Sequence, residues 1–404
     1  MTLPHSDAPS PAPAAAPAAA PQGATLAPSS GPAAPALSPA GPPPPAFGFE
    51  REPLQALADD LGVALLDDPA GPLAGHPMPA LAPWPSGLVM PVFDLGLLRA
   101  SGPEAVRFLH SQLTNDIEKL APGTAQWSGY CTAKGRLQAS FLGWRADTPE
   151  APVVELALTL PLAPVLRKRL SMFVLRAKLK ITDDSARAAF FGLAGESAGR
   201  WLAGHLGTTP AEGEVVHAAG LTAIGLPAVA LDACGLNLVL PRWLLSCPRD
   251  QAAGLWTAAR AALPGGPGAL WRWLEVLSGL PRVTPGTWEH FVPQMVNLEL
   301  VGGVNFKKGC YPGQEVVARS QYLGKLKRRM HLGRVDGLPP APGADVSAAG
   351  GHEPCGEVVL AAADPLRGGA LLLFESQTAA VQAGALSVDG RAISLLPLPY
   401  SLPA

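Results

Sequence analysis

Turn residues divide this 404-residue chain into short segments. Its 44 glycines and 46 prolines exceed ordinary usage, and they separate apolar runs of strand and helix length. Hydrophobic residues still make up 48% of the chain and charged residues only 15%, so a large core can form. Strands and helices alternate over most of the length, which predicts an α+β fold of two or three domains.

Residues 1–46 are rich in Pro, Ala, Gly and Ser and end in "GPPPPAF". Such a segment cannot bury enough apolar surface to offset its ordering entropy, so we expect a disordered tail. No Lys or Arg precedes Arg51, which argues against a secretory signal and a mitochondrial transit peptide. No apolar run reaches about 18 residues, so no membrane span is expected.

Residues 47–324 carry most of the predicted elements. A strand is expected over 87–100, followed by a helix in "SGPEAVRFLHSQLTNDI", where Ser101 can cap and Pro103 suits the first helical position. Residues 126–146 predict a hairpin that turns at Lys134–Gly135. Further helices are expected over 163–178, 196–207, 249–264 and 268–279.

Residues 325–404 have a different sequence pattern from the preceding region. Short strands are split by Gly and Pro, and Asp389–Gly390 between two of them indicates a tight hairpin. This pattern predicts a small all-β barrel as the C-terminal domain.

Charge and cysteine usage restrict the partners. The formal net charge is −2, so bulk charge predicts no direct nucleic-acid partner. The five cysteines are widely spaced and odd in number, which indicates free thiols in a reducing compartment such as the cytoplasm. The eight histidines are scattered, so no metal site is expected.

The segment "KKGCYPGQEVVARSQ", residues 307–321, places Cys310 beside Lys307 and Lys308. Pro312 either lies in a turn or begins a helix, and in both cases Cys310 precedes a run of free N–H groups. Cations and helix N-termini both stabilise a thiolate. Two interpretations are therefore open: a reactive, exposed thiolate, or a small cysteine buried in a tight turn.

Two further features suit a ligand. Residues 316–335 contain basic residues and no acid, which favours either a polyanion site or a charged, solvated edge strand. Trp271 and Trp273 lie on different faces of the predicted helix, so one can line a cavity and stack on a flat heteroaromatic ligand while the other is core. The alternative is that both are core. The basic residues are Arg319, Lys325, Lys327, Arg328, Arg329 and Arg334.

The sequence Gly195–Gly199 matches the G-x-S-x-G pattern of a nucleophile elbow, with Ser197 at its centre. Asp232 or Asp250, with His290, could complete a serine-hydrolase triad. The alternative is an ordinary strand-to-helix turn, because short Gly/Ser matches are common in a Gly-rich chain.

The signature "KKGCYPGQEVVAR" resembles that of the YgfZ family, folate-binding relatives of the glycine-cleavage aminomethyltransferase. The segments "SGPEAVRFLHSQLTNDI", "CTAKGRLQASF", "GLPRVTPGTWEHFVPQMVNLELVGGVNFKKGC" and "LPLPYSL" resemble the same family, so the likeness covers roughly residues 87–404. It implies aminomethyltransferase-like α+β modules around a central folate pocket over 47–324, with a β-barrel over 325–404.

The resemblance also implies a function. Members bind tetrahydrofolate or a derivative and support the maturation or repair of iron–sulfur enzymes, through which tRNA modification is affected. Iron–sulfur client enzymes or assembly factors are the implied partners. Cys310 is the motif cysteine and Trp271 falls at a pocket position. The remaining implied cofactor-binding residues are Lys308, Gly309, Tyr311, Gly313, Gln314, Glu315 and, from the basic segment, Arg319.

The chain departs from the true aminomethyltransferases at two positions. Those enzymes carry a catalytic carboxylate just after the Lys-Gly turn, but no acid follows Lys134–Gly135 before Ala139. Their pterin-binding glutamate would fall at the apolar Leu277. Because aminomethyl transfer needs a charged group near the folate nitrogen, the sequence argues against catalysis. A folate-dependent one-carbon transferase is the alternative.

Overall fold

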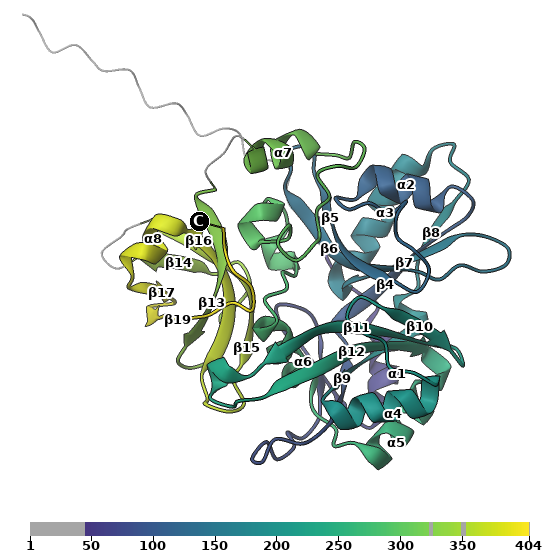
Figure 1. Ribbon diagram of the computed structural model, residues 1–404, viewed down its shortest axis with the longest axis horizontal. Helices are drawn as coiled ribbons and strands as arrows, with labels where there is room; N and C mark the ends of the chain where they lie inside the picture. The colour runs from purple at the N-terminus through teal and green to yellow at the C-terminus, as the bar shows by residue number, and fades with distance from the viewer. Residues whose placement is uncertain (1–44, 323–325, 349–352, 404) are drawn as a thin grey trace, which may run out of the picture. The chain divides into compact units, whose positions relative to one another are not determined.

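The computed structural model of the chain describes residues 45–322, 326–348 and 353–403 (Figure 1). The predicted tail lies outside the described residues except for positions 45 and 46. The described part contains four antiparallel sheets, one of them only two-stranded, and eight α-helices.

The first five-stranded sheet contains the predicted hairpin, which is confirmed. Its strands, in spatial order, are β5 (Ala125–Cys131), β6 (Leu137–Arg145), β7 (Val153–Thr159), β4 (Leu95–Ser101) and β8 (Lys180–Asp183). Helices α2 (Ala105–Gln112) and α3 (Ala163–Val174) pack against it. The predicted cap at Ser101 is wrong, because Ser101 stays in β4 and pairs with Val153 and Lys180.

The second five-stranded sheet is covered on one face by three helices that share an apolar core with it. Its strands are, in spatial order, β10 (Val215–Ala218), β11 (Leu221–Ala230), β12 (Val239–Pro248), β9 (Ala188–Ala194) and β3 (Leu88–Val92). The helices are α1 (Arg51–Leu61), α4 (Glu196–Leu206) and α5 (Ala252–Ala262). A small hairpin, β1 (Ala64–Leu66) and β2 (Leu73–Gly75), follows α1.

The strand predicted over 87–100 is two strands in different sheets. The chain passes from β3 to β4 through Phe93 and Asp94, both buried. Asp94 accepts hydrogen bonds from Arg272 and Arg282, so a charged network fixes the break. A buried carboxylate needs such partners, and the local sequence does not reveal them.

The C-terminal strands form one nearly closed, barrel-like sheet of seven strands, as predicted. Their spatial order is β18 (Arg391–Ala392), β17 (Leu386–Val388), β14 (Asp345–Ala348), β15 (Pro354–Ala363), β16 (Ala370–Gln377), β13 (Arg328–Val335) and β19 (Ser394–Leu396). Helix α8 (Thr378–Ala383) follows β16, and α7 (Gln314–Tyr322) precedes the sheet.

Helix α6 (Gly268–Leu277) joins the sheets (Figure 1). It packs against β2, β3, β15 and β16, and eight of its ten residues are buried. A helix that is apolar nearly all round belongs inside a core. The helix ends as predicted, with Gly279 at φ +64, a backbone conformation that glycine adopts without strain.

No helix in the described part of the chain is long and apolar enough to span a bilayer.

Candidate functional site

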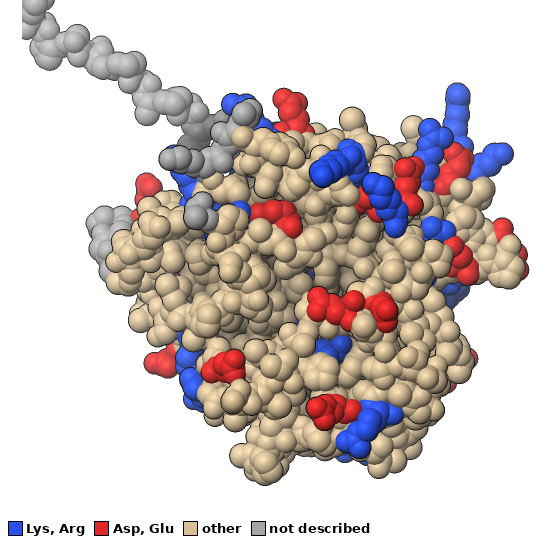
Figure 2. All heavy atoms as spheres, viewed as in Figure 1, with Lys and Arg blue, Asp and Glu red and all other residues tan. Residues whose placement is uncertain are grey.

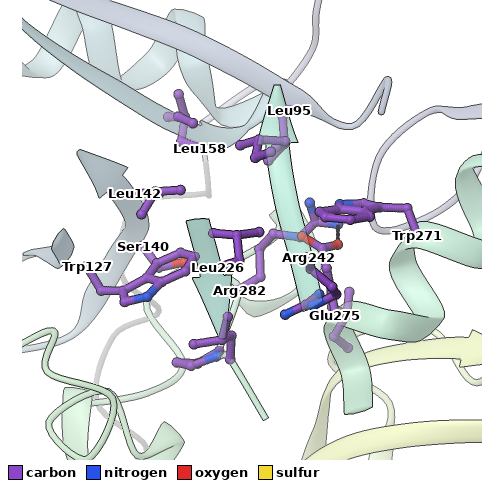
Figure 3. Close-up of a pocket in the computed structure, with 15 residues that line it drawn as sticks. Leu95, Trp127, Ser140, Leu142, Leu158, Leu226, Arg242, Trp271, Glu275 and Arg282 are labelled. Atoms are coloured by element: carbon purple, nitrogen blue, oxygen red, sulfur yellow. Dashed lines mark ion pairs between the residues drawn. The ribbon is translucent and has the colours of Figure 1, made fainter. Parts of the chain in front are cut away.

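A cavity lies where the two five-stranded sheets meet α6 (Figure 3). Most of its wall is apolar, with three charged side chains at one side. The lining residues are Leu95, Trp127, Ser140, Leu142, Ala157, Leu158, Leu226, Arg242, Leu244, Trp271, Glu275, Leu280, Pro281, Arg282 and Leu360. An apolar cavity with a few convergent polar groups is the usual form of a small-molecule site.

Trp271 packs closely on strand β9 at Gly192. A Cβ atom at Gly192 would sit only 2.1 Å from the indole Cε3, so glycine is needed for this close approach. The guanidinium of Arg242 lies 5.4 Å from the ring centre. The indole is 1% exposed and its Nε1 has no hydrogen-bond partner among the described residues, so a ligand reaches it only through the cavity.

Three charged groups gather beside this indole (Figure 3). Arg282 Nη2 lies 3.1 Å from Glu275 Oε2 and 2.5 Å from Asp94 Oδ2. Burial raises the pKa of Glu275 and lowers that of Arg242 to about 10. Burial alone would lower the pKa of Arg282, but Asp94 and Glu275 raise it above its usual value.

Several donors on this wall are unused. Arg242 Nη1 and Arg282 Nε and Nη1 are buried without a hydrogen-bond partner among the described residues. Buried polar atoms without partners are rare in proteins, because each one costs free energy. The wall is therefore suited to a ligand with hydrogen-bond acceptors.

The space inside the cavity is small. About 40 Å³ is open to the centres of water molecules, which exceeds the roughly 10–15 Å³ that one water needs. The cavity can therefore hold at least one water molecule.

Glu275 is a residue that sequence reasoning missed. The resemblance directed attention to Leu277, which is buried in the apolar core and is not among the lining residues. Glu275 follows Trp271 by four positions, so both project from one face of α6. Helical spacing from Trp271 would have found it.

The signature segment lies apart from the cavity lining. Its cysteine, Cys310, is exposed. The four cysteines elsewhere in the chain are buried: Cys131, Cys234, Cys247 and Cys355. The interpretation of Cys310 as a buried turn cysteine is therefore wrong.

Lys308 anchors the signature to helix α2. Its Nζ donates hydrogen bonds to the carbonyl oxygens of His110 and Leu113, the latter at 2.6 Å, and lies 4.9 Å from the Tyr311 ring centre. A cation is favourable at the end of a helix, where carbonyl groups lack partners. Burial lowers the pKa of Lys308 to about 8.

Gly313 docks the signature against the β5–β6 turn. Its φ is +80, and a Cβ atom there would lie 2.4 Å from the Thr132 carbonyl oxygen. Helix α7 then begins at Gln314, so Pro312 precedes the helix. The hairpin thus links the two regions: its turn contacts the signature, and its strands contribute Trp127, Ser140 and Leu142 to the cavity.

The remaining predicted site residues surround this contact. Gly309 is exposed beside His110, and Gln314 is half-buried at the start of α7. Glu315 and Arg319 are exposed on α7. Of the residues predicted to bind a cofactor, Trp271 lines the cavity; none of the others is among its described lining residues.

The predicted positive stripe over 316–335 is wrong for β13. Arg328 pairs with Glu375, Arg334 with Asp364 and Arg329 with Glu299. The edge-strand alternative is wrong too, because β13 lies between β16 and β19. Lys325 lies outside the described residues.

The described residues do not form the serine-hydrolase triad. Ser197 Oγ donates to Ser86 Oγ at 2.8 Å and accepts from Arg200 Nη2 at 2.8 Å. His290, the proposed base, instead lies 2.6 Å from a Glu357 oxygen. The G-x-S-x-G match is a strand-to-helix turn.

Comparison with curated proteins finds relatives named tRNA-modifying protein YgfZ. The one from Colwellia psychrerythraea is 30% identical over 253 residues, which cover 63% of this chain and 73% of the relative. The one from Edwardsiella ictaluri is 30% identical over 339 residues, which cover 82% of this chain and 96% of the relative. The chain belongs to the YgfZ family. A comparison with models of protein families gives no match.

Solved structures support the fold of this YgfZ-family chain. The glycine cleavage system aminomethyltransferase T from Bartonella henselae superposes with a TM-score of 0.62, over 86% of this chain and 96% of that protein. The sequences are only 16% identical, so this likeness concerns the fold alone.

Proposed function

We propose that this protein is a folate-binding accessory factor that supports the maturation or repair of iron–sulfur enzymes and, through them, tRNA modification. The names of its relatives and the aminomethyltransferase fold support this proposal. The structural observation that carries it is the cavity in which Trp271, Arg242, Glu275 and Arg282 converge.

This set of side chains matches the chemistry of a reduced pterin. The pterin ring is flat and has both N–H donors and carbonyl or ring-nitrogen acceptors along its edge. Trp271 offers an aromatic surface, Glu275 accepts from N–H groups, and the two arginines supply free donors. Glu275 would serve as the pterin-binding carboxylate that the resemblance placed at Leu277.

Binding of tetrahydrofolate is tested by titration calorimetry together with tryptophan fluorescence. We expect quenching in the native protein, because a stacked pterin contacts Trp271. Trp271→Phe should lose most of the quenching and weaken binding, whereas Trp273→Phe is the matched control on the same helix, packed on Trp84 away from the cavity. Equal quenching in both variants would refute the pocket assignment.

Cys310 is proposed as the working thiolate, supported by its exposure, which leaves its sulfur accessible to a partner. One thiolate cannot hold a cluster alone, so its role is a transient one with an iron–sulfur client enzyme or assembly factor. Exposed and buried free thiols suit a reducing compartment such as the cytoplasm.

A deletion strain tests this role. Iron–sulfur enzyme activities and tRNA thiomethylation should fall, and be restored by the native gene but not by a Cys310→Ser version. Full rescue by Cys310→Ser would remove the thiolate from the proposal while leaving folate binding untouched.

A further inference from the structure

The end of α3 displays large apolar side chains to solvent. Met172 is 65% exposed, Phe173 52% and Leu175 88%. The helix makes its buried contacts earlier, at Leu166 and Leu170 among others. The three exposed residues, here called the apolar tip, therefore add little to the packing of α3. Neighbouring exposed apolar side chains of this kind mark interaction surfaces more often than isolated ones do.

The backbone of the apolar tip is strained. Leu175 follows the last residue of α3 with φ +43 and ψ −99. A positive φ at the end of a helix is typical of glycine, because a Cβ atom makes it unfavourable. Leu175 gains no burial in return. Strain that folding does not explain is concentrated at functional surfaces.

Basic side chains flank the apolar tip on both sides in the sequence. The chain contains no Asp or Glu from residue 156 to residue 182. Of the six basic residues in this span, only Arg169 is turned inward: it is half-buried, and its Cζ lies 5.9 Å from the centre of the Trp288 ring. The five exposed ones are Arg167, Lys168, Arg176, Lys178 and Lys180.

These five cations are available to a partner. Within the described part of the chain none of their side chains forms an ion pair, whereas Arg99 of the adjacent strand β4 pairs with Glu155 at 3.4 Å. Glu104 contacts the span through the backbone N–H of Lys178, at 2.7 Å. Acidic side chains occur elsewhere on this surface (Figure 2), so the positive charge is concentrated in residues 167–180.

Charge and side-chain type together favour an anionic lipid surface. Clusters of roughly four to eight Lys or Arg attract anionic headgroups, and adjacent large apolar side chains enter the boundary between headgroups and acyl chains. Nucleic acid would use the cations and could stack a base on Phe173. It would leave the aliphatic side chains of Met172 and Leu175 without a role.

We propose that residues 167–180 form a peripheral docking surface for anionic bilayers. The apolar tip enters between the lipid headgroups, and the five exposed cations lie against the lipid phosphates. This inference goes beyond the proposed folate binding and does not depend on it.

Co-sedimentation of the full chain with lipid vesicles tests the charge contribution. The native protein should sediment with vesicles that contain phosphatidylglycerol but not with pure phosphatidylcholine vesicles, and added salt should weaken binding. Lys168→Gln combined with Arg176→Gln should weaken binding about 25-fold, since each cation near an anionic surface contributes roughly fivefold. Arg200→Gln, at an exposed arginine of α4, is the matched control and should bind as the native protein does.

A second pair of variants tests insertion. The fluorescence that Phe173→Trp adds to the native spectrum should shift to shorter wavelength with phosphatidylglycerol vesicles. Leu338→Trp, at a leucine that is 82% exposed in the C-terminal region, should show no shift. Met172→Ser combined with Phe173→Ser should lose most of the vesicle binding at an undiminished melting temperature, because both side chains are largely exposed.

Loss of vesicle binding in both double variants, with binding retained in Arg200→Gln, would support the docking surface. A native protein that does not bind phosphatidylglycerol vesicles would overturn it, including the case in which the same cations bind tRNA instead. Undiminished binding in the double serine variant would overturn it as well. In each of these cases the folate proposal would still stand.

Discussion

Cys310 differs from the other cysteines in its surroundings. Burial raises the pKa of Cys234 to about 11 and that of Cys247 to about 12, and it also raises that of Cys131. Since only the thiolate is nucleophilic, the buried thiols should react slowly. We expect Cys310 to be modified first by a disulfide reagent, as read by mass spectrometry of the labelled peptides.

The control for this reactivity is the unfolded protein, in which all five cysteines should react at similar rates. Cys310→Ser should remove the fast phase in the folded protein. A fast phase that survives this substitution would show that exposure does not govern reactivity here.

Glu375 makes stability depend on pH. Its side chain is fully buried, and burial raises its pKa from 4.5 to about 7 despite the partner Arg328. The folded state therefore holds a proton that the unfolded state releases between these values, so stability falls as pH rises from about 4.5 to 7. The shift corresponds to roughly 3 kcal/mol.

Glu375→Gln cannot ionise and should lose this dependence. Between pH 4.5 and pH 8 the difference in unfolding free energy between the two proteins should therefore shift by about 3 kcal/mol in favour of the variant. Urea denaturation at each pH measures this difference. The partly exposed Arg328 can turn to solvent in the variant. Parallel pH profiles for the two proteins would mean that Glu375 titrates normally.

At the scale of elements, hairpins were easier to predict than breaks in strands. The β5–β6 turn follows from local chemistry, since Gly135 has φ +72 where glycine is favoured. The split between β3 and β4 depends on Asp94 meeting Arg272, which is 178 residues away in sequence. Likewise, the basic residues of β13 could not be assigned to acid partners from neighbouring positions alone.

In the candidate site, too, residues placed by local spacing could be predicted from sequence, whereas contacts between distant segments could not. Residue type and helical position point to Trp271 and Trp273 together, and only the family resemblance selects Trp271. Glu275 could have been predicted from its spacing to Trp271. The contact of Arg282 with Asp94 could not, because the two residues are 188 positions apart in sequence and meet only in the folded chain.

The end of α3 has a strained residue in an exposed place. Leu175 has φ +43 and ψ −99 and is 88% exposed. The surface over α2, α3 and β8 carries charged side chains of both signs (Figure 2). Leucine in such a conformation costs about 1 kcal/mol or more.

Leu175→Gly should therefore raise the unfolding free energy by about 1 kcal/mol, which thermal denaturation would show as a higher Tm. Leu338, which is 82% exposed and has no positive φ, is the matched control, and Leu338→Gly should give no gain. A lower Tm for Leu175→Gly would indicate that its side chain makes a stabilising contact.

At the scale of the whole molecule, a buried ion network lies where the two five-stranded sheets meet α6. Asp94, 2% exposed between β3 and β4, accepts from Arg272 of α6 and from Arg282 of the cavity wall. Burial alone would raise the pKa of Asp94, but Arg282 and Arg272 lower it below its usual value. The network thus connects the strand break, the central helix and the candidate site.

Removing the Asp94 charge should affect both stability and binding. Asp94→Asn removes the carboxylate that Arg272 and Arg282 share and leaves each with one acidic partner, Asp68 and Glu275 respectively. We therefore expect a loss of about 3 kcal/mol in urea denaturation, the lower end for a broken buried pair. Tetrahydrofolate binding should weaken as well, because Arg282 then keeps only Glu275 to hold it at the cavity wall. Since its pKa is lowered, the contribution of Asp94 is present above pH 3.8 and is lost as pH falls below that value.

Asp67→Asn provides the comparison, because Asp67 pairs with Arg51 at 2.6 Å while remaining 77% exposed. An exposed pair contributes less than about 1 kcal/mol, so this variant should behave almost as the native protein at every pH. Comparable losses in the two variants would show that burial does not set the strength of the Asp94 network. The inference that α6 and the cavity wall depend on that network for their positions would then fail.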